Sequence, residues 1–370
     1  MSKTRREFIR LSALLAAGMS LPAKAQSPLK LLILGGTGFV GPHMVRYAVS
    51  RGHKVSIFTR GNKQLDVPGV EYLVGDRNNE LSALTGRTWD VVLDNNARDY
   101  RWVQASTALL RSAAEHYILI SSITAYAIEG FGYENWQRIL WEPMVNESTT
   151  RVSPPEDWSM GDEATYGLTK ALSEDIVHAV FPSRCTIVRP GLIVGPGDPT
   201  DRFTYWPVRL NEGGEILAPG NPNHANQIID QRDLTEWIIR LAEGRVAGDF
   251  NATGPNYRMT MSTMLGAIGS AVDSDYSLAW ISEQFLQQQN ISPWSDMPTW
   301  IPGDSLSFVS VERAIEAGLT FRTVEQTARD TLMWDRTRPQ IERQNRQAGI
   351  TREREREIIE AWKNRPRRIK

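Results

Sequence analysis

Two side chains suited to acid–base chemistry stand four residues apart in the segment Tyr166-Gly-Leu-Thr-Lys170. On a helix this spacing places both side chains on one face. The lysine ammonium can then lower the pKa of the tyrosine phenol and help to hold the ribose of a cofactor. The pair indicates proton transfer of the kind that accompanies hydride chemistry.

A glycine loop upstream supplies a matching cofactor site. It reads Gly35-Gly-Thr37-Gly38-Phe39-Val40-Gly41 and follows an apolar run at 29–34. We expect Gly35 to permit a tight turn, Gly38 to let the backbone approach a pyrophosphate, and Gly41 to allow close helix–strand packing. The phosphates would lie at the positive end of the helix that begins near Phe39. Loop and pair together predict a nicotinamide enzyme.

The elements that must position these residues follow an alternating pattern from residue 29 onward. Apolar runs alternate with helical patterns, which predicts a parallel sheet covered on both faces, a doubly wound α/β fold of Rossmann type. Strands are expected at 29–34, 54–58, 70–74, 89–93, 117–121 and 184–188, and helices at 39–51, 100–115 and 161–180.

The chain divides into four predicted parts. Residues 1–25 form an export signal, and 26–195 form the NAD(P)-binding domain. Residues 196–335, where prolines interrupt the alternation, form mainly a smaller substrate-binding lobe, with some segments returning to the first domain. Helices are expected there at 233–243 and 261–272, and a short strand at 250–251. Residues 336–370 form a charged helix and tail that is solvated by default or, alternatively, serves as an oligomer arm.

The first 25 residues have the pattern of a twin-arginine signal. Thr4-Arg-Arg-Glu-Phe-Ile-Arg10 precedes an apolar run at 11–21 and the cleavage-like Ala23-Lys-Ala25. This run is too short to span a bilayer. We therefore expect a periplasmic or extracellular protein without a membrane span after signal removal; the alternative is a chance basic start. Cys185 is the single cysteine and is expected to be a buried structural thiol, so no intrachain disulfide can form.

Composition narrows the functional classes. With 41% apolar residues, 23% charged residues and a net charge of −1, the chain gives no reason to propose nucleic-acid binding. The five histidines show no metal-ligand spacing, so no metal site is predicted. The 12 tryptophans favour core packing, with a carbohydrate-stacking surface as the alternative.

Residues after the next three strands bear on the choice of cofactor. Arg60 stands after the second strand, where an acidic residue would mark NAD, and its guanidinium can pair with a 2′-phosphate, so NADP is favoured over NAD. Alternatively, Arg60 stacks on adenine or points to water. Asp76 can accept a hydrogen bond from the adenine amino group, and Asn96 and Ala97 would line the adenosine side of the cleft.

These ordered pieces resemble the extended short-chain dehydrogenase/reductase superfamily, in its NAD-dependent epimerase/dehydratase branch. The resemblance covers about residues 29–255. Beyond the glycine loop, Asp76 and the Tyr166–Lys170 pair, it rests on Ile120-Ser-Ser-Ile-Thr-Ala-Tyr126, Arg189-Pro-Gly191 and Ile229-Asp-Gln-Arg-Asp-Leu234. Phe58-Thr-Arg-Gly61 and Gly75-Asp-Arg77 look most like an atypical group that includes the chloroplast stem-loop-binding proteins.

The resemblance implies roles for individual residues. Ser122, with Thr124 as the backup candidate, would hydrogen-bond the substrate oxygen that is oxidised or reduced. Tyr166 would act as general acid/base, and Lys170 would lower its pKa and bind the nicotinamide ribose. Backbone at Pro190 and Gly191 would border the nicotinamide.

One position departs from the family pattern. Sugar-nucleotide epimerases carry an arginine that contacts the nucleotide diphosphate, where this chain has Asn226. This weakens the prediction of a UDP-sugar substrate, although Arg202 or Arg209 can substitute. The aromatic residues of 129–158 are expected to form part of the substrate wall, or merely to pack that insertion.

The sequence thus predicts an NAD(P)-dependent epimerase/dehydratase-type oxidoreductase acting on a hydroxyl-bearing small molecule, with a sugar as one candidate. The alternatives are a reductase or dehydrogenase with exchanging cofactor, and a non-catalytic RNA- or ligand-binding protein on the same scaffold. Because an exported enzyme meets no soluble NAD(P)H pool, a cofactor that stays bound and is regenerated in each cycle is expected. A homo-oligomer is compatible with the sequence.

Overall fold

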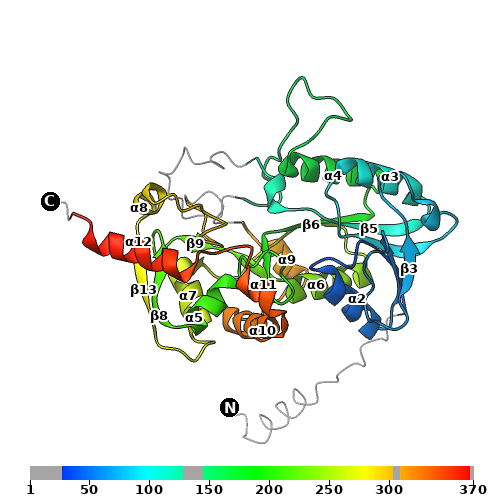
Figure 1. Cartoon of the computed structure of the whole chain (residues 1–370). Coiled ribbons are helices and arrows are strands. Elements are labelled where there is room, and N and C mark those ends of the chain that lie inside the picture. Colours follow the sequence, from blue (N-terminus) through cyan, green and yellow to red (C-terminus); the bar gives the residue numbers. More distant parts are fainter. Residues whose placement is uncertain (1–26, 128–144, 303–308, 367–370) are drawn as a thin grey trace, which may run out of the picture.

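A continuous apolar run lets the first strand, β1 (Lys30–Leu34), bury both of its faces. Leu31 and Ile33 join one core cluster and Leu32 and Leu34 another, and all four side chains are fully buried. A strand buried on both sides belongs in the middle of a sheet that carries helices on both faces. The computed structural model, which describes residues 27–127, 145–302 and 309–366, has this arrangement (Figure 1).

A seven-stranded parallel sheet forms the centre of the first domain. In spatial order its strands are β11 (Gly248–Ala252), β6 (Cys185–Pro190), β5 (Ala114–Ile120), β4 (Trp89–Asp94), β1, β2 (Lys54–Thr59) and β3 (Glu71–Val74). The strand order reverses at β1, which is the mark of a doubly wound sheet. The predicted fold class is confirmed, and all six predicted strands are present.

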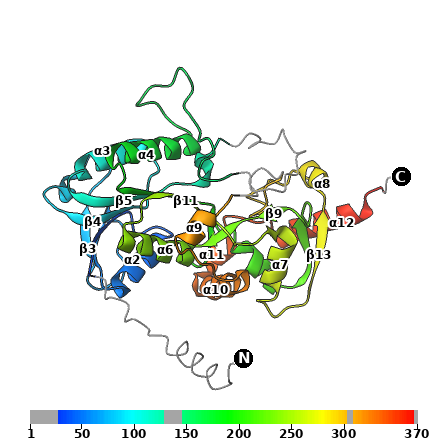
Figure 2. The ribbon, with the colours of Figure 1, turned by 180° about the vertical axis from the view of Figure 1, so that it is seen from behind.

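Helices cover both faces of this sheet. Figures 1 and 2 show α3 (Tyr100–Leu110) and α4 (Tyr166–Val180) on one face, and α2 (Gly41–Ser50) and α6 (Gln231–Gly244) on the other. The short η1 (Ser82–Leu84) and η2 (Ile123–Ala125) follow β3 and β5. Both α6 and β11 come from within 196–335, so this part of the chain returns to the sheet.

A second lobe is built around its own core. Its larger elements are the parallel pair β8 (Gly214–Pro219) and β13 (Tyr276–Ile281), with α5 (Tyr205–Asn211), α7 (Met261–Gly269), α10 (Val324–Thr337) and α12 (Arg352–Asn364). Its smaller elements are β7 (Leu192–Val194), β10 (Ile228–Asp230), β9 (Ala225–Asn226), β12 (Met259–Thr260), α8 (Glu283–Gln288) and α11 (Gln340–Gln344); α9 (Glu312–Glu316) instead contacts β11.

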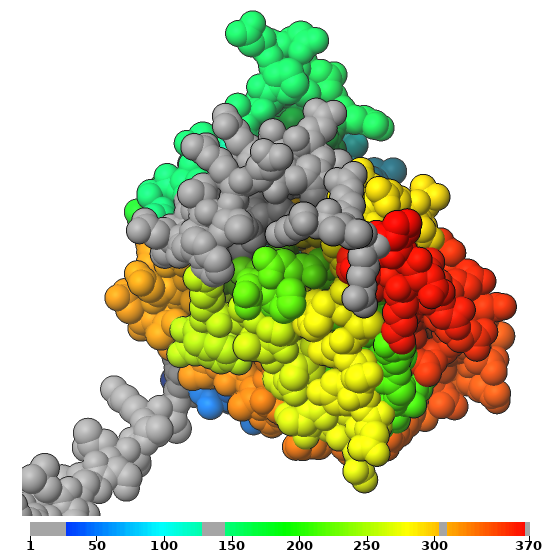
Figure 3. Space-filling view, turned by 90° about the vertical axis from the view of Figure 1, so that its left-hand side faces the viewer, coloured from blue at the N-terminus to red at the C-terminus, as the bar shows by residue number. Residues whose placement is uncertain are grey.

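The C-terminal helix α12 is only partly solvated. Ile358 and Ile359 are buried in the core of the second lobe, and Glu355 accepts a hydrogen bond of 2.8 Å from Nε of Arg209. In the space-filling view α12, in red, lies against the yellow and green segments that contain β13 and β8 (Figure 3). One face of this otherwise charged helix is thus packed against the core of the second lobe.

Candidate functional site

The glycine loop lies between the carboxyl end of β1 and the amino end of α2. Gly35 and Gly36 have φ of 108° and 103°, a region that side chains rarely adopt. A Cβ on Gly41 would lie 2.3 Å from the carbonyl carbon of Gly36, whereas a Cβ on Gly38 would meet no atom within 4 Å. The tight turn at Gly35 and the close packing at Gly41 are therefore present, and Gly38 faces open space of the kind a pyrophosphate needs. These residues fit a dinucleotide.

The strand beside the loop carries Asn96 and Ala97 to the same edge of the sheet. A Cβ on Gly35 would lie 3.4 Å from Cβ of Asn96, so the loop and this segment pack together. Thr37 and Phe39 are half-buried, whereas Val40 and Ala97 are buried. The structure thus gathers the predicted loop and adenosine-side residues into one surface.

A buried ion pair that sequence reasoning missed supports this surface from below. Two nitrogens of Arg77 donate to the two carboxylate oxygens of Asp94 at 2.6 and 2.7 Å, and Tyr117 donates to Asp94 at 2.7 Å. Burial disfavours the charge of Asp94, but Arg77 outweighs it and keeps the pKa of Asp94 below its usual value. Arg77 also donates to the carbonyl of Asn96 at 3.2 Å, which fixes the backbone beside the loop.

Ser122, Tyr166 and Lys170 converge at the carboxyl end of β5. Ser122 caps η2, and its Oγ accepts hydrogen bonds from Oγ1 and N of Thr124 at 2.9 and 3.2 Å. Lys170 is buried, donates from Nζ to the carbonyl of Ile120 at 3.1 Å, and lies 5.5 Å from the ring centroid of Tyr166. Tyr166 keeps 56% of its surface exposed. The phenol is therefore the member of the trio that a ligand can reach most easily.

The electrostatics of the trio differ from the sequence-based expectation. Partial burial raises the pKa of Tyr166, and a hydrogen bond with Ser122 and the charge of Arg98 oppose this only in part. Burial lowers the pKa of Lys170 to about 8, against the attraction of Asp94 and Glu174. The expected lowering of the Tyr166 pKa by Lys170 is thus not seen in the protein alone, in which burial outweighs the opposing effects and the ammonium donates to the carbonyl of Ile120.

Gly167 explains how α4 brings Tyr166 to Ser122. The helix begins at Tyr166 rather than at the predicted residue 161, with Thr165 as its N-cap. A Cβ on Gly167 would lie 2.5 Å from the carbonyl oxygen of Thr124. Only glycine lets the first turn of α4 approach the turn after β5 so closely.

Glu174 also holds α4 against the turn that follows β5. It is fully buried one turn beyond Lys170, accepts hydrogen bonds from Arg189 at 2.7 and 2.9 Å, and accepts another from Ser121. Through Ser121 it holds the residue next to Ser122. Sequence reasoning passed over Glu174 because a lone glutamate on a helix is usually solvated.

Two further predicted cofactor residues, Arg60 and Asp76, follow the ends of β2 and β3. Arg60 is exposed after β2, and its charge contributes to a lowered pKa of Asp76, which is due first to a hydrogen bond from the backbone of Asn78. Because Oδ1 of Asp76 accepts from N and Nδ2 of Asn78 at 2.8 and 2.7 Å, one oxygen of this predicted adenine acceptor is already engaged.

Pro190 ends β6, and Gly191 leads from it into β7. A Cβ on Gly191 would lie 2.3 Å from Oγ1 of Thr253, so the backbone here passes very close to the residue that follows β11. Both residues stand at the carboxyl edge of the sheet, as the glycine loop does.

Several sequence-based expectations concern the substrate side. The aromatic residues at 131, 133, 136 and 141 lie outside the described residues. Asn226 donates from Nδ2 to the carbonyl of Thr299 at 3.0 Å, and Arg209 is paired with Glu355. Trp206, Trp237 and Trp300 are buried, which favours core packing for these three. Cys185 is a buried free thiol.

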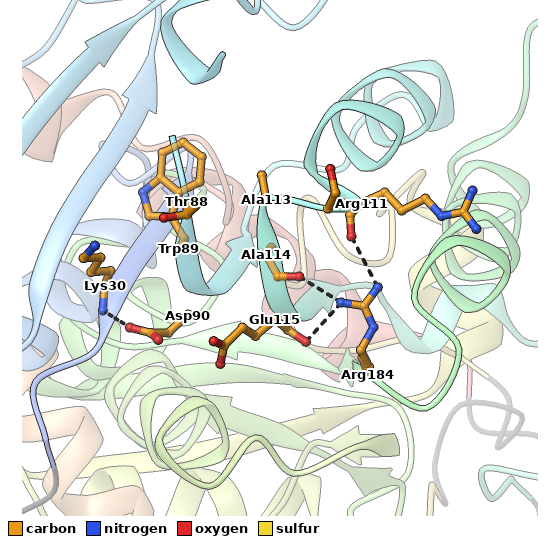
Figure 4. A pocket seen from close by; sticks show the side chains of 10 residues that line it. Lys30, Thr88, Trp89, Asp90, Arg111, Ala113, Ala114, Glu115 and Arg184 are labelled. Carbon is orange, nitrogen blue, oxygen red and sulfur yellow. Dashed lines mark hydrogen bonds between the residues drawn. The ribbon is translucent and has the colours of Figure 1, made fainter. Parts of the chain in front are cut away.

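A separate hollow of about 660 Å³ lies at the opposite, amino edge of the sheet (Figure 4). Two of its charged side chains, those of Asp90 and Arg184, are engaged within the protein. Asp90 accepts from the backbone of Lys30 at 2.6 Å, and Arg184 donates to carbonyls of Arg111, Ala114 and Glu115. This hollow lies away from the glycine loop and the tyrosine.

Within the described residues, no cluster of three or more His, Cys, Asp or Glu side chains is arranged to hold a metal ion. No helix in the same ranges is long and apolar enough to cross a membrane.

The sheet with its reversal at β1, and a glycine turn beside a Tyr–Lys pair, define a protein of the dinucleotide-binding dehydrogenase/reductase class. Within this class, the chain belongs to the NAD-dependent epimerase/dehydratase family, whose model matches residues 31–252. The family match and the central sheet thus agree on a dinucleotide-binding fold of the epimerase/dehydratase type.

Two named proteins match the chain at moderate identity. The chain is 26% identical over 257 residues to chloroplast stem-loop binding protein of 41 kDa b from Arabidopsis thaliana, covering 64% of this chain and 62% of that protein. It is 30% identical over 179 residues to 2-alkyl-3-oxoalkanoate reductase from Stenotrophomonas maltophilia, covering 46% and 52%. The chain thus spans between half and two thirds of these relatives' lengths.

Solved structures share the fold at low identity. The Bordetella bronchiseptica enzyme WbmH in complex with NAD+ has a TM-score of 0.59 at 15% identity, covering 84% of this chain and 99% of that one. UDP-N-acetylglucosamine 4-epimerase from Bacillus cereus has a TM-score of 0.59 at 16% identity, covering 84% and 98%. At this identity the likeness concerns the fold alone.

Proposed function

We propose that the protein is an NAD(P)-dependent epimerase/dehydratase-type oxidoreductase that acts on a hydroxyl-bearing small molecule, with sugars among the candidates. The observation that carries the proposal is the convergence of Ser122, Tyr166 and Lys170 at the carboxyl end of β5, on the same edge of the parallel sheet as the glycine loop that follows β1. The alternative from the same class is a reductase or dehydrogenase that exchanges its cofactor.

Each residue of the trio has a role in this proposal. When bound, the nicotinamide supplies a hydride acceptor and donor. Ser122 Oγ, held by Thr124, donates to or accepts from the substrate oxygen. Tyr166 must start as the phenolate to take the proton of the substrate hydroxyl, and as the phenol it returns this proton in the reverse step. Lys170 would hold a positive charge beside the phenolate before the proton is taken, and it would donate to the cofactor ribose in place of the Ile120 carbonyl.

The open surface at Gly38 and the amino end of α2 would hold the pyrophosphate, and Arg60 would hold a 2′-phosphate, which favours NADP. We further propose that the segment 1–25 directs the folded protein through the twin-arginine pathway to the periplasm or beyond. Since no soluble cofactor pool is expected there, the cofactor would be loaded before export and regenerated within each cycle.

Native mass spectrometry of the exported, mature protein tests this proposal. We expect one NAD(P) per chain after extended dialysis, and no net absorbance change at 340 nm while a substrate from a panel of sugar nucleotides and free sugars turns over. Steady accumulation of reduced cofactor would favour the exchanging dehydrogenase instead. A protein without bound nucleotide that exchanges added cofactor rapidly would overturn cofactor retention.

Substitution of the phenol tests the catalytic assignment. Tyr166→Phe should retain the nucleotide but lose turnover by about 10²–10⁴-fold, the usual contribution of a positioned acid–base group. Tyr257→Phe is the matched control, because Tyr257 is also an exposed tyrosine. Turnover of Tyr166→Phe at the wild-type rate would refute the role of Tyr166.

A further inference from the structure

Arg98 is an exposed cation at the carboxyl edge of the sheet, four residues after the end of β4. β4 and β5 are parallel neighbours, and Asp94 at the end of β4 lies beside Leu119 of β5. The chain therefore leaves both strands at the same edge, toward Arg98 after β4 and toward Ser122 after β5. Because β4 adjoins β1 on its other side, Arg98 follows the strand that lies between the glycine loop and Ser122.

The segment that presents Arg98 is fixed on both sides. Before it, the carbonyl of Asn96 accepts from Nη1 of Arg77 at 3.2 Å. After it, Asp99 caps α3, and its carboxylate accepts from Nε and Nη2 of Arg101 at 2.9 and 2.6 Å. The adjacent carboxylate is thus engaged by Arg101. In the part of the chain that the structure describes, no hydrogen bond or ion pair engages the side chain of Arg98.

Tyr100 brings the start of α4 to this segment. Its phenol oxygen donates to the carbonyl of Asp162 at 3.0 Å, and its ring joins Leu168, from the first turn of α4, in one buried cluster. Arg98 lies two residues before Tyr100. Tyr166 lies two residues before Leu168, so the two residues flank the same contact between α3 and α4 (Figures 1 and 2).

The charge of Arg98 acts on both ionisable members of the catalytic trio. Burial raises the pKa of Tyr166, and a hydrogen bond with Ser122 and the charge of Arg98 oppose this rise. Burial also lowers the pKa of Lys170, and the charge of Arg98 adds to this decrease. A cation that favours the phenolate and disfavours the ammonium must stand within electrostatic reach of both groups.

Arg98 keeps its charge at the pH at which Tyr166 ionises, whereas Lys170 does not. The pKa of Lys170 is about 8, and that of Tyr166 is raised above its usual value of 10.0. In the protein without cofactor, Lys170 has therefore lost its proton before the phenolate forms, while a guanidinium remains charged throughout this range. The charged groups that face Lys170 are Asp94, Glu174, Arg77 and Arg98.

We propose that Arg98 is a positioning residue for the reaction: its guanidinium stabilises the phenolate from which Tyr166 must start. This inference rests on the proposed function and adds a residue to it. Arg98 acts through Tyr166, and Lys170 shares its role only while the ammonium is protonated. Because Arg98 is exposed, water screens its charge and the coupling to the phenolate is modest.

The test is a series of charges at position 98, measured on the full chain with and without NADPH. Carbon-13 at Cζ of tyrosine reports the ionisation of each phenol by NMR, and Tyr166→Phe identifies the signal of Tyr166. Arg98→Met should raise the pKa of Tyr166 by about 0.5 and Arg98→Glu by about 1, whereas Arg98→Lys should restore most of the wild-type value. Arg111→Glu, an exposed position beside the hollow at the opposite edge of the sheet, is the matched control (Figure 4).

The charge series separates an electrostatic role from a structural one. A structural role would make methionine and glutamate equivalent at position 98 and would leave lysine without a rescuing effect. The same Tyr166 pKa in wild type, Arg98→Met and Arg98→Glu overturns the inference, as does a failure of Arg98→Lys to restore it.

The failure of the proposed function is read separately. A chain that does not bind NADPH, or Tyr166→Phe that turns over at the wild-type rate, refutes the proposed function and with it the use of Arg98 in catalysis, even where the charge series shifts the pKa. Loss of turnover in Tyr166→Phe together with a constant Tyr166 pKa across the series contradicts this inference alone.

Discussion

Replacing Lys170 by methionine should stabilise the protein near neutral pH and make its relative stability depend on pH. Burial lowers the pKa of Lys170 from 10.5 to about 8. At 1.36 kcal/mol for each pKa unit, the folded protein carries a cost of about 3 kcal/mol for this charge below pH 8. Methionine removes that cost and also the hydrogen bond to Ile120, which contributes about 1 kcal/mol. The expected net gain at pH 7 is about 2 kcal/mol.

The sign of the pH dependence follows from proton binding. Between pH 8 and 10.5 the unfolded chain holds a proton that folded Lys170 has lost, so wild-type stability rises with pH across this window. Above pH 10.5 the charging cost is absent and Lys170→Met should be about 1 kcal/mol less stable than wild type, because of the lost hydrogen bond. The difference between the two proteins should therefore change sign.

Urea unfolding of the cofactor-free proteins at pH 7 and pH 11, followed by tryptophan fluorescence, measures this difference. Gln104→Met, on the exposed face of α3, is the control, since it introduces the same side chain without removing an ionisable group. A stability difference between Lys170→Met and wild type that is equal at both pH values would refute the reasoning. The variant should also lose activity, so the lysine is retained at the expense of stability.

Two further predictions concern the cofactor. Gly38→Ala should fold normally but bind NAD(P) more weakly by about 1–3 kcal/mol, the usual penalty for an added methyl group in a filled site. Gly41→Ala should instead destabilise the fold by about 3 kcal/mol, because its Cβ would lie 2.3 Å from the backbone of Gly36. Thermal unfolding and cofactor titration separate the two effects, and equal effects of both variants on stability would contradict the assignment. Arg60→Asp should lower the ratio of NADP to NAD affinity about ten- to hundredfold, because a charge-assisted pair with the 2′-phosphate is lost. Arg356→Asp, an exposed position on α12, is the control. An unchanged affinity ratio in Arg60→Asp would argue that the Arg60 side chain points to water.

Local sequence patterns predicted six strands of the central sheet, but they did not predict where β5 begins or the short strands outside this sheet. The six predicted strands exist because their apolar runs are long enough to be recognised without knowing their neighbours. β5 begins at Ala114 instead of 117, since His116 is polar by type yet buried against Thr186 of β6. The short strands β7, β9 and β10 were not predicted, because such segments become strands only through distant partners.

The same limit applies to the site. The glycine loop, Tyr166 and Lys170 were predictable because their spacing alone implies their geometry. Arg77–Asp94 and Glu174–Arg189 were not, since whether a charged side chain is buried and paired depends on residues that the fold brings together. Glu355 was missed for the same reason: its partner Arg209 is 146 residues away along the chain.

The position of α12 has a consequence for the order of events during synthesis. This helix supplies Ile358 and Ile359 to the core of the second lobe, and Glu355 to a buried pair with Arg209. It is the last of the described elements to leave the ribosome, so that core stays open, and Arg209 lacks its buried carboxylate, until this helix has been made. On the proposed export route, the N-terminal signal segment would be available for recognition long before α12 completes the folded second lobe. Completion of α12, rather than emergence of the signal, would then decide when the protein is ready for transport.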